Sequence, residues 1–128
     1  MKEQHKEQAI GIIKNILHAI HEKRYGDIIT YVDETETKDI DELFEFVQGT
    51  LELNDFDAID EYGVPCNFHP EYEYSQLNFY EYNNLSGFEV EYAMTSDSEL
   101  IDMVLQLKFL YTDDVDRIKS TFITVDPQ

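Results

Sequence analysis

The stretch FEVEYAMTSDSELIDMVLQLKFLY, residues 88–111, decides the fold. Apolar residues occupy every second position on both sides of the turn-forming segment TSDSE (residues 95–99). This period of two predicts two long strands, over residues 88–94 and 100–111, joined as an antiparallel hairpin. The apolar positions are Phe88, Val90, Tyr92, Met94, Ile101, Met103, Leu105, Leu107, Phe109 and Tyr111. One face of this hairpin is therefore expected to lie on a hydrophobic core.

Two further strands are expected beside this hairpin. On its N-terminal side Leu77 and Phe79 alternate with polar neighbours, which predicts a strand over about residues 77–83, and NNLSG (residues 83–87) then supplies turn chemistry. On its C-terminal side TDDVD (residues 112–116) forms the next turn, and residues 117–125 form the last strand. Residues 71–126 are therefore predicted to make an antiparallel meander sheet of about four strands.

Residues 1–63 follow the helical period instead. Apolar side chains at Ile10, Ile13, Leu17 and Ile20 predict an amphipathic helix over residues 3–24. Shorter helices are expected after Asp27, within IDELFEFVQGT (residues 40–50) and within FDAIDEYG (residues 56–63). Helices followed by a strand meander define an α+β fold, so residues 1–128 are predicted to form one domain with the helices packed on one face of the sheet.

The chain has a formal charge of −19, from 28 acidic and nine basic side chains. No Lys or Arg occurs from Asp39 to Leu107, a span that holds 17 Asp and Glu residues. This charge disfavours direct nucleic-acid binding, because phosphate contacts need clustered cations. It favours a basic protein partner, whose association rate it would raise at low salt. The alternative is that the charge serves solubility alone.

The single cysteine, Cys66, excludes an intramolecular disulfide and fits a reducing compartment. The first twenty residues mix Lys, Glu and Gln with apolar positions, which is unlike the uninterrupted apolar run of a signal peptide. No stretch approaches the roughly 18 apolar residues that suggest a membrane span. We therefore expect a cytoplasmic protein without membrane contact.

Two groups of motifs resemble known families. RYGDIITYVDE (residues 24–34) is similar to the opening of NTF2-like (cystatin-like) domains, which implies a long helix packed in a curved sheet. IDEYG (residues 59–63), the strand pair at residues 88–111 and IKSTFITV (residues 118–125) resemble an uncharacterised family of small bacterial domains. That family shows Arg-Ser-Asp-Leu at the entry to its third strand, whereas this chain has Leu100, Ile101, Asp102 and Met103, so only the aspartate matches. The resemblance implies a fold and no activity.

Two residue pairs have the spacing of chemical sites. His18 and His21 lie three residues apart on the first helix, as two metal ligands would, but their neighbours indicate a solvent-facing flank. Cys66 and His69 form C-x-x-H, yet the surrounding carboxylates oppose formation of a reactive thiolate. We expect no catalytic residue, no metal ligand and no cofactor from these pairs.

The segment HPEYEYSQLNFYEYNN (residues 69–84) has the composition of a protein-binding surface. Tyrosines supply rigid amphipathic contact area, and glutamates supply countercharge for Lys or Arg on a partner. The expected contact residues are Tyr72, Tyr74, Tyr80, Tyr82, Glu71, Glu73, Glu81, Glu89 and Glu91. The alternative is an edge strand whose tyrosines cover the core while its glutamates prevent edge pairing.

Three functional hypotheses follow. The first is a non-catalytic acidic interaction protein, for example an immunity or antitoxin-like protein that neutralises a basic nuclease toxin. The second is an NTF2-like small-molecule-binding protein or enzyme, with Asp102 or a tyrosine hydroxyl in a pocket between the first helix and the sheet. The alternative for Asp102 is a capping or pairing role at the entrance of its strand. The third is a homodimer, instead of a monomer, that forms through Val104 and Leu110 on the outer side of the long strand. A core that is closed against the first helix would argue against the second hypothesis.

Overall fold

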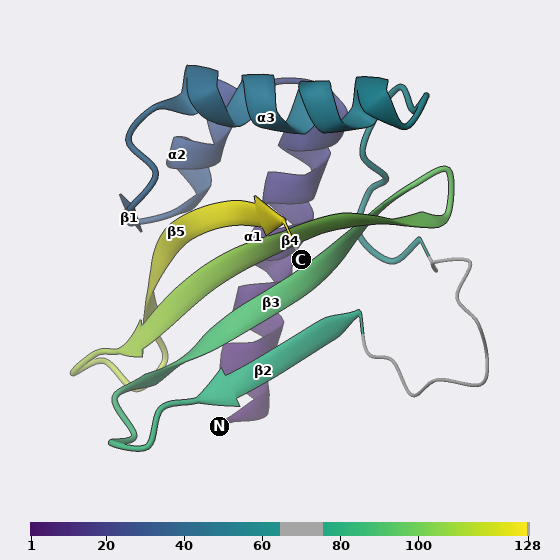
Figure 1. Ribbon diagram of the computed structural model, residues 1–128. Coiled ribbons are helices and arrows are strands. Elements are labelled where there is room, and N and C mark those ends of the chain that lie inside the picture. Colours follow the sequence, from purple (N-terminus) through teal and green to yellow (C-terminus); the bar gives the residue numbers. More distant parts are fainter. Residues whose placement is uncertain (65–75, 128) are drawn as a thin grey trace, which may run out of the picture.

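The computed structural model describes residues 1–64 and 76–127, except for the side chains of Asp102 and Pro127 (Figure 1). The helices precede the main strands, so the predicted α+β class with N-terminal helices is confirmed. In chain order the elements are α1 (Glu3–His21), the 3₁₀ turn η1 (Tyr25–Asp27), α2 (Ile28–Tyr31), β1 (Glu34–Thr35), α3 (Ile40–Leu53), β2 (Leu77–Glu81), β3 (Gly87–Ser96), β4 (Glu99–Tyr111) and β5 (Ile118–Pro127).

The sheet has the strand order β1-β5-β4-β3-β2, so the predicted meander forms from β2 to β5. These four strands pair antiparallel, with Phe79 opposite Val90 and Val90 opposite Leu107. Within residues 1–64 and 76–127 the sheet is mixed and has five strands instead of about four, because β1 pairs parallel with β5. The sequence pattern did not predict β1, since a strand of two residues is too short to show a period of two.

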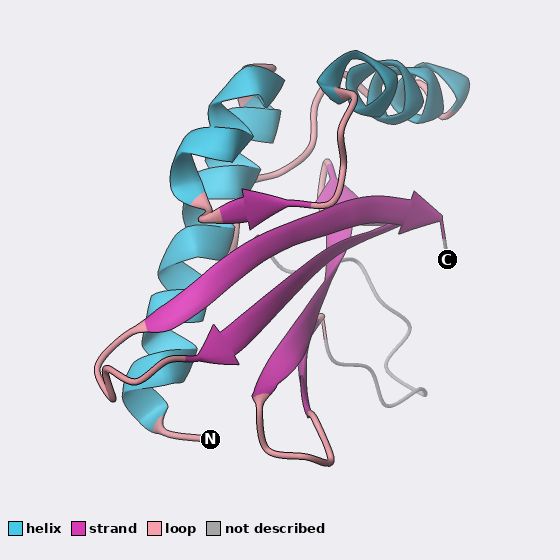
Figure 2. Cartoon of the chain, turned by 90° about the vertical axis from the view of Figure 1, so that its left-hand side faces the viewer, coloured by secondary structure: helices cyan, strands magenta, loops and turns pink. Residues whose placement is uncertain are grey.

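The hydrophobic core lies between α1 and the sheet, and Figure 2 shows α1 against one side of the strands. Ile13, Ile16 and Leu17 are fully buried on the helix. From the strands, the ring of Phe88 stacks on that of Phe109, with 5.2 Å between the ring centroids. The alternating apolar positions of β4 are buried as predicted, namely Ile101, Met103, Leu105, Leu107 and Phe109. The centre of the interface between α1 and the sheet is therefore filled by side chains.

Residues near the starts of the two long helices favour their formation. α1 ends at His21, and Glu3 lies in its first turn, where a carboxylate interacts favourably with the helix dipole. α3 begins at Ile40 because the Asp39 carboxylate accepts hydrogen bonds from the backbone amides of Asp41 and Glu42. Neither helix, nor any other in the described part of the chain, combines the length and the hydrophobicity needed to cross a membrane.

Residues 56–63 do not form the predicted short helix. The backbone amide of Asp60 donates to the carbonyl of Thr95, 2.8 Å away, so this segment follows the end of β3. The Asp60 carboxylate accepts from the Thr95 hydroxyl and from the backbone amides of Asp97 and Ser98, at 2.8–3.2 Å. Aspartate forms such backbone contacts in competition with a helix. The helix prediction was wrong because Asp60 holds the β3–β4 turn instead of the first turn of a helix.

Candidate protein-binding surface

Four of the predicted contact residues lie on one face of the sheet. Tyr80 pairs with Glu89 across β2 and β3. Successive side chains on a strand point to opposite faces, so Tyr82 and Glu91 lie on the same face as this pair. Phe88 and Val90 point the other way into the core. We call Tyr80, Tyr82, Glu89 and Glu91 the β2–β3 surface, and the side of the sheet that carries them, away from α1, the open face.

The β2–β3 surface is partly organised by its own contacts. The Tyr82 hydroxyl donates to the Glu89 carboxylate at 2.8 Å. Burial raises the pKa of the Tyr82 phenol above its ordinary value, and the hydrogen bond to Glu89 raises it further. Tyr80 has 49% of its surface exposed. Tyr80 is thus the aromatic side chain of this group that is most accessible to a partner.

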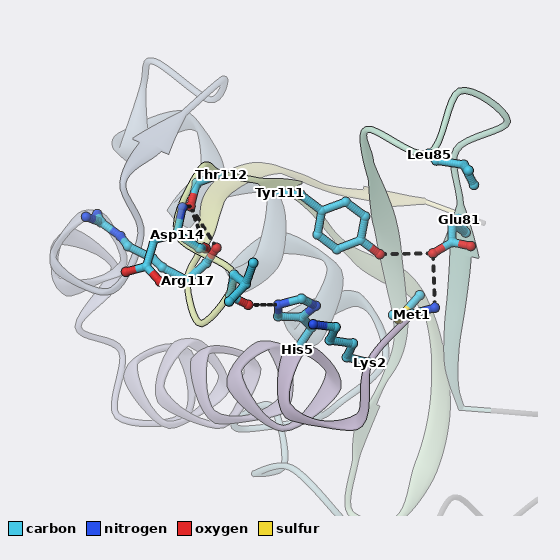
Figure 3. Close-up of a pocket in the computed structure, with 10 residues that line it drawn as sticks. Met1, Lys2, His5, Glu81, Leu85, Tyr111, Thr112, Asp114 and Arg117 are labelled. Atoms are coloured by element: carbon cyan, nitrogen blue, oxygen red, sulfur yellow. Dashed lines mark hydrogen bonds and ion pairs between the residues drawn. The ribbon is translucent and has the colours of Figure 1, made fainter.

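Glu81 lies apart from the other predicted contact residues. Its carboxylate accepts a hydrogen bond from the Tyr111 hydroxyl at 2.9 Å and pairs with the Met1 amino group at 3.3 Å (Figure 3). The bond from Tyr111, followed by the contact with the amino group, lowers the pKa of Glu81. This position follows from strand alternation, because Glu81 stands between Tyr80 and Tyr82 and so points to the opposite face. Composition alone did not separate it from the glutamates of the open face.

The remaining predicted contact residues lie outside the described residues. These are Glu71, Tyr72, Glu73 and Tyr74, and the Cys66 and His69 pair also lies there. Asp102 belongs to β4, but its side chain is not described. Val104, a predicted dimer contact, has only 9% of its surface exposed, whereas Leu110 is half-buried.

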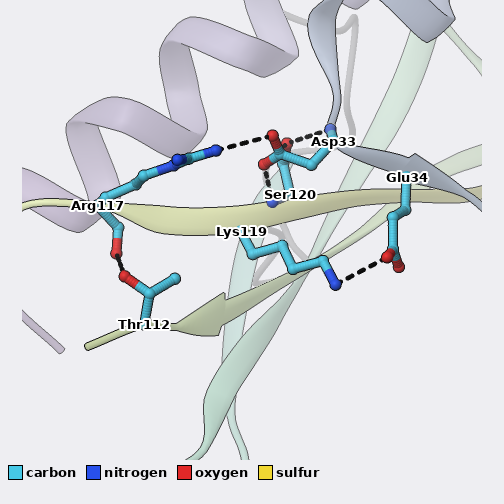
Figure 4. Close-up of polar contacts among 6 residues, drawn as sticks. All are labelled: Asp33, Glu34, Thr112, Arg117, Lys119 and Ser120. Atoms are coloured by element: carbon cyan, nitrogen blue, oxygen red, sulfur yellow. Dashed lines mark hydrogen bonds and ion pairs between the residues drawn. The ribbon is translucent and has the colours of Figure 1, made fainter. Parts of the chain in front are cut away.

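Basic side chains also lie on the open face, at β4 and β5. Lys108 stands opposite Glu89 in the β3–β4 register, and its ammonium group pairs with Glu36 at 3.4 Å. Lys119 pairs with Glu34 at 2.7 Å, as Figure 4 shows. The alternation of β4 already indicated that Lys108 points outward. The open face therefore combines a β2–β3 part that is acidic and aromatic with a β4–β5 part that carries ion pairs.

Asp33 attaches the chain after α2 to the start of β5. Its carboxylate accepts from the Ser120 amide at 2.9 Å and from Arg117 at 3.2 Å (Figure 4). The backbone hydrogen bond from Ser120 is the main cause of the lowered pKa of Asp33, and Arg117 lowers it further. These contacts hold β1 in place beside β5 and account for the acidic and basic groups at this corner.

His18 and His21 make contacts within the fold. The Nδ1 atom of His18 contacts the Glu61 carboxylate, and this hydrogen bond is the main cause of the lowered pKa of Glu61. The Nδ1 atom of His21 lies 2.7 Å from the carbonyl of Ile59. Both histidines thereby connect α1 to residues 56–63. Among the residues described, no group of three or more His, Cys, Asp or Glu side chains is arranged to hold a metal ion.

A pocket of about 390 Å³ lies at the N-terminal end of α1, beside Tyr111 and Glu81 (Figure 3). His5 is 5% exposed and lines this pocket, and its Nε2 atom lies 2.9 Å from the carbonyl of Val115. The ring of His5 packs on that of Tyr111 with 5.2 Å between the centroids. The pocket is at one end of the interface between α1 and the sheet, and not in its filled centre.

Comparison with known proteins gives a family and no activity. A family model described as Domain of unknown function (DUF7668) matches residues 17–127, from within α1 to the end of β5. No curated protein and no solved structure matches the chain. The expected membership of an uncharacterised family is therefore confirmed.

Proposed function

The chain belongs to the DUF7668 family, and we propose that it is a non-catalytic acidic protein that binds a basic protein partner through the β2–β3 surface. The observation that carries this proposal is that Tyr80 stands opposite Glu89 in the β2–β3 register and that the Tyr82 hydroxyl donates to the same glutamate, so both tyrosines lie beside Glu89 on the face that also carries Glu91. Tyrosines and carboxylates at one place match a partner surface that presents Lys or Arg. A nuclease toxin that is neutralised by this chain, as by an immunity protein, is the most concrete partner of this kind.

The net charge of −19 supports the same proposal. A field of this sign steers a cationic protein toward the chain and raises its association rate, typically by about 10- to 1000-fold at low ionic strength. Tyr80, which is half exposed, offers the apolar contact that would slow dissociation. In this proposal the net charge mainly determines the association rate, and the aromatic contact of Tyr80 mainly determines the dissociation rate.

The experiment measures these two rates separately. A basic protein captured by the chain from its source cell is purified, and its binding is followed by surface plasmon resonance between about 0.05 and 0.5 M salt. We expect Glu91→Gln to lower the association rate mainly at low salt and Tyr80→Ala to raise the dissociation rate. Asp41→Asn is the matched control, because it removes one exposed negative charge from the distant helix α3. An affinity that does not change with salt, or equal effects of E91Q and D41N, would contradict the proposal.

A second candidate function is supported by the pocket beside His5. Its volume of about 390 Å³ lies in the usual range for small-molecule sites, about 300–1,000 Å³. An NTF2-like ligand-binding protein would use such a pocket at the end of α1. A fragment screen monitored by NMR tests this candidate: ligands should shift the amide signals of Leu85 and Val115, and a screen without such shifts would exclude it.

A further inference from the structure

One flank of α3 is only partly covered by the described fold, because Phe46 packs against the edge of the core while Leu53 on the same flank is exposed. The helix buries Leu43, Val47 and Leu51 in the core, and Gln48 on a second flank donates to the Tyr25 hydroxyl at 2.7 Å. At 100° per residue, a third flank carries a separate row of side chains. This row consists of Glu42, Phe46, Gly49 and Leu53.

Two adjoining hollows lie along this flank and share Phe46. The first, of about 550 Å³, lies between α3 and the end of β5, and its apolar lining comes from Leu43, Phe46 and Val125. The second continues along the helix past Gly49 to Leu53. Leu53 has 88% of its surface exposed, which is a large apolar exposure for a helical residue. We call these two shallow hollows together the α3 groove. From Glu42 to Leu53 it is about 16 Å long, or three helical turns.

Gly49 lies in the middle of α3, and the fold itself does not require a glycine there. A Cβ atom added at this position would meet no other atom within 4 Å. Glycine in a helix interior destabilises the helix relative to alanine, because the unfolded chain has more conformational freedom. A glycine on a helix surface does allow another backbone to approach closely. Gly49 therefore fits a contact with a partner better than it fits the stability of α3.

The charges around the groove define the chemistry of that partner. Five carboxylates and one basic side chain, Lys38, line the two hollows. Glu36 is paired with Lys108 and Asp39 caps α3, which leaves Glu42, Glu52 and Asp126 as the border charges for a partner. A second copy of the chain would bring the same carboxylates against these, and like charges at an interface cost several kcal/mol. A basic segment would instead bring Lys or Arg to this border.

We propose that the α3 groove binds an amphipathic helix of a basic protein. Apolar side chains of that helix lie on Phe46 and Leu53, its backbone passes close to Gly49, and its Lys or Arg side chains meet Glu42 and Asp126. Binding of an amphipathic helix in an apolar groove is a common form of peptide recognition. This site goes beyond the β2–β3 surface, and it does not depend on that surface.

The test uses a synthetic helical peptide of about 18 residues that carries Leu at i, i+3, i+4 and i+7 positions and Lys elsewhere. Its binding to the ¹⁵N-labelled full chain is followed by NMR, and its affinity by fluorescence anisotropy. We expect shifts of the Phe46, Gly49 and Leu53 amide signals, and no binding of the same peptide with Glu in place of Lys. Shifts restricted to other acidic surfaces would overturn the α3 groove as the site.

Gly49→Ala tests the close approach, with Gly11→Ala as the matched control. Gly11 is also a helical glycine whose added Cβ would meet nothing within 4 Å, but it lies on the exposed side of α1. Both variants should raise the midpoint of thermal unfolding, because alanine is the better helix former. Only G49A should weaken peptide binding, by at least about fivefold. Equal affinities of the two variants would overturn the role of Gly49.

The border charges and the alternative occupant are tested in the same assay. Glu42→Gln should weaken peptide binding at low salt, while Asp41→Asn, on the solvent side of the same helix turn, should leave it unchanged. Sedimentation of the chain alone tests for a second copy in the groove, and a dimer that G49A dissociates would overturn the proposal. Tyr80→Ala should not change peptide binding. Failure at the α3 groove and failure at the β2–β3 surface therefore give different results.

Discussion

The two faces of the sheet differ in burial, although their side chains alternate along the same strands. On β3, Phe88 and Val90 are buried against α1, while Glu89 and Glu91 point to the open face. On β4, Leu107 is buried and Lys108 points outward to pair with Glu36. The covered face consists of close-packed apolar side chains, whereas the charged side chains of β3 and β4 lie on the open face and make hydrogen bonds and ion pairs there. The comparison predicts that substitutions on the open face change the stability of the fold much less than substitutions on the covered face of the same strand.

The largest expected difference is between Phe109 and Glu91. Phe109 is fully buried and stacks on Phe88, so Phe109→Ala should lower the free energy of unfolding by about 3–5 kcal/mol. Glu91→Gln on the open face should change it by less than about 0.5 kcal/mol. Urea unfolding followed by circular dichroism measures both values. Similar losses for the two variants would show that the open face is also part of the core.

Gly87 is the position of β3 where even a methyl group is not tolerated. A Cβ atom there would lie 2.1 Å from the carbonyl oxygen of Phe109 and 2.9 Å from the Cα atom of Leu110. These are backbone atoms, which cannot turn away as a side chain can. We expect Gly87→Ala to cost about 2–3 kcal/mol of unfolding free energy. A stability equal to that of the wild type in the same urea experiment would mean that β3 and β4 can separate locally at no cost.

Asp60 holds the turn between β3 and β4. Its carboxylate accepts three hydrogen bonds from the β3–β4 hairpin, including the amides of Asp97 and Ser98. Asp60→Ala should therefore cost about 2 kcal/mol and increase hydrogen exchange of these two amides. Asp57→Ala, an exposed neighbour, is the control. Unchanged exchange at Asp97 and Ser98 would mean that the turn forms without Asp60.

The smallest effect concerns Asp33, and it depends on pH. The pKa of Asp33 in the fold is lowered below the ordinary value of 3.8, so the ionised carboxylate stabilises the folded state. This contribution is complete well above pH 3.8 and is lost as the pH falls through the lower pKa of the folded state. Because Asp33 is partly exposed to solvent, we expect a loss of about 1 kcal/mol at neutral pH for Asp33→Asn.

Unfolding of wild type and D33N between about pH 2 and pH 7 measures this effect. The difference in unfolding free energy between the two proteins should be constant near neutral pH and should disappear in acid. A difference that grows as the pH falls would contradict the assigned direction of the pKa change.

Much of the sheet was predictable because its strands are long and one face is buried. The ten alternating apolar positions between Phe88 and Tyr111 leave one pairing that puts all of them on the core. β1 was not predictable, since its two residues pair with Thr121 and Phe122, more than 80 positions away. The helix prediction over residues 56–63 failed because helical propensity does not register the distant amides that Asp60 binds.

The candidate surfaces were predictable in part. The composition of residues 69–84 pointed to Tyr80 and Tyr82, and strand alternation could have separated Glu81 from them. The α3 groove was not predicted, because residues 40–50 indicated only a short helix and Leu53 lies beyond them. Phe46, Gly49 and Leu53 repeat at helical spacing too, but a second stripe has meaning only when the structure shows which side of α3 is already covered.

The parallel pairing of β1 with β5 has a consequence for synthesis of the chain. Glu34 emerges from the ribosome long before Thr121, its partner in the sheet, has been added. At about 5–20 residues per second, β1 waits several seconds or longer for the strand beside which it belongs. During this time α1 exposes the apolar face that the sheet later covers, and the nascent chain is open to chaperones. The β1–β5 edge of the sheet therefore forms only after residues 121 and 122 have been added to the chain.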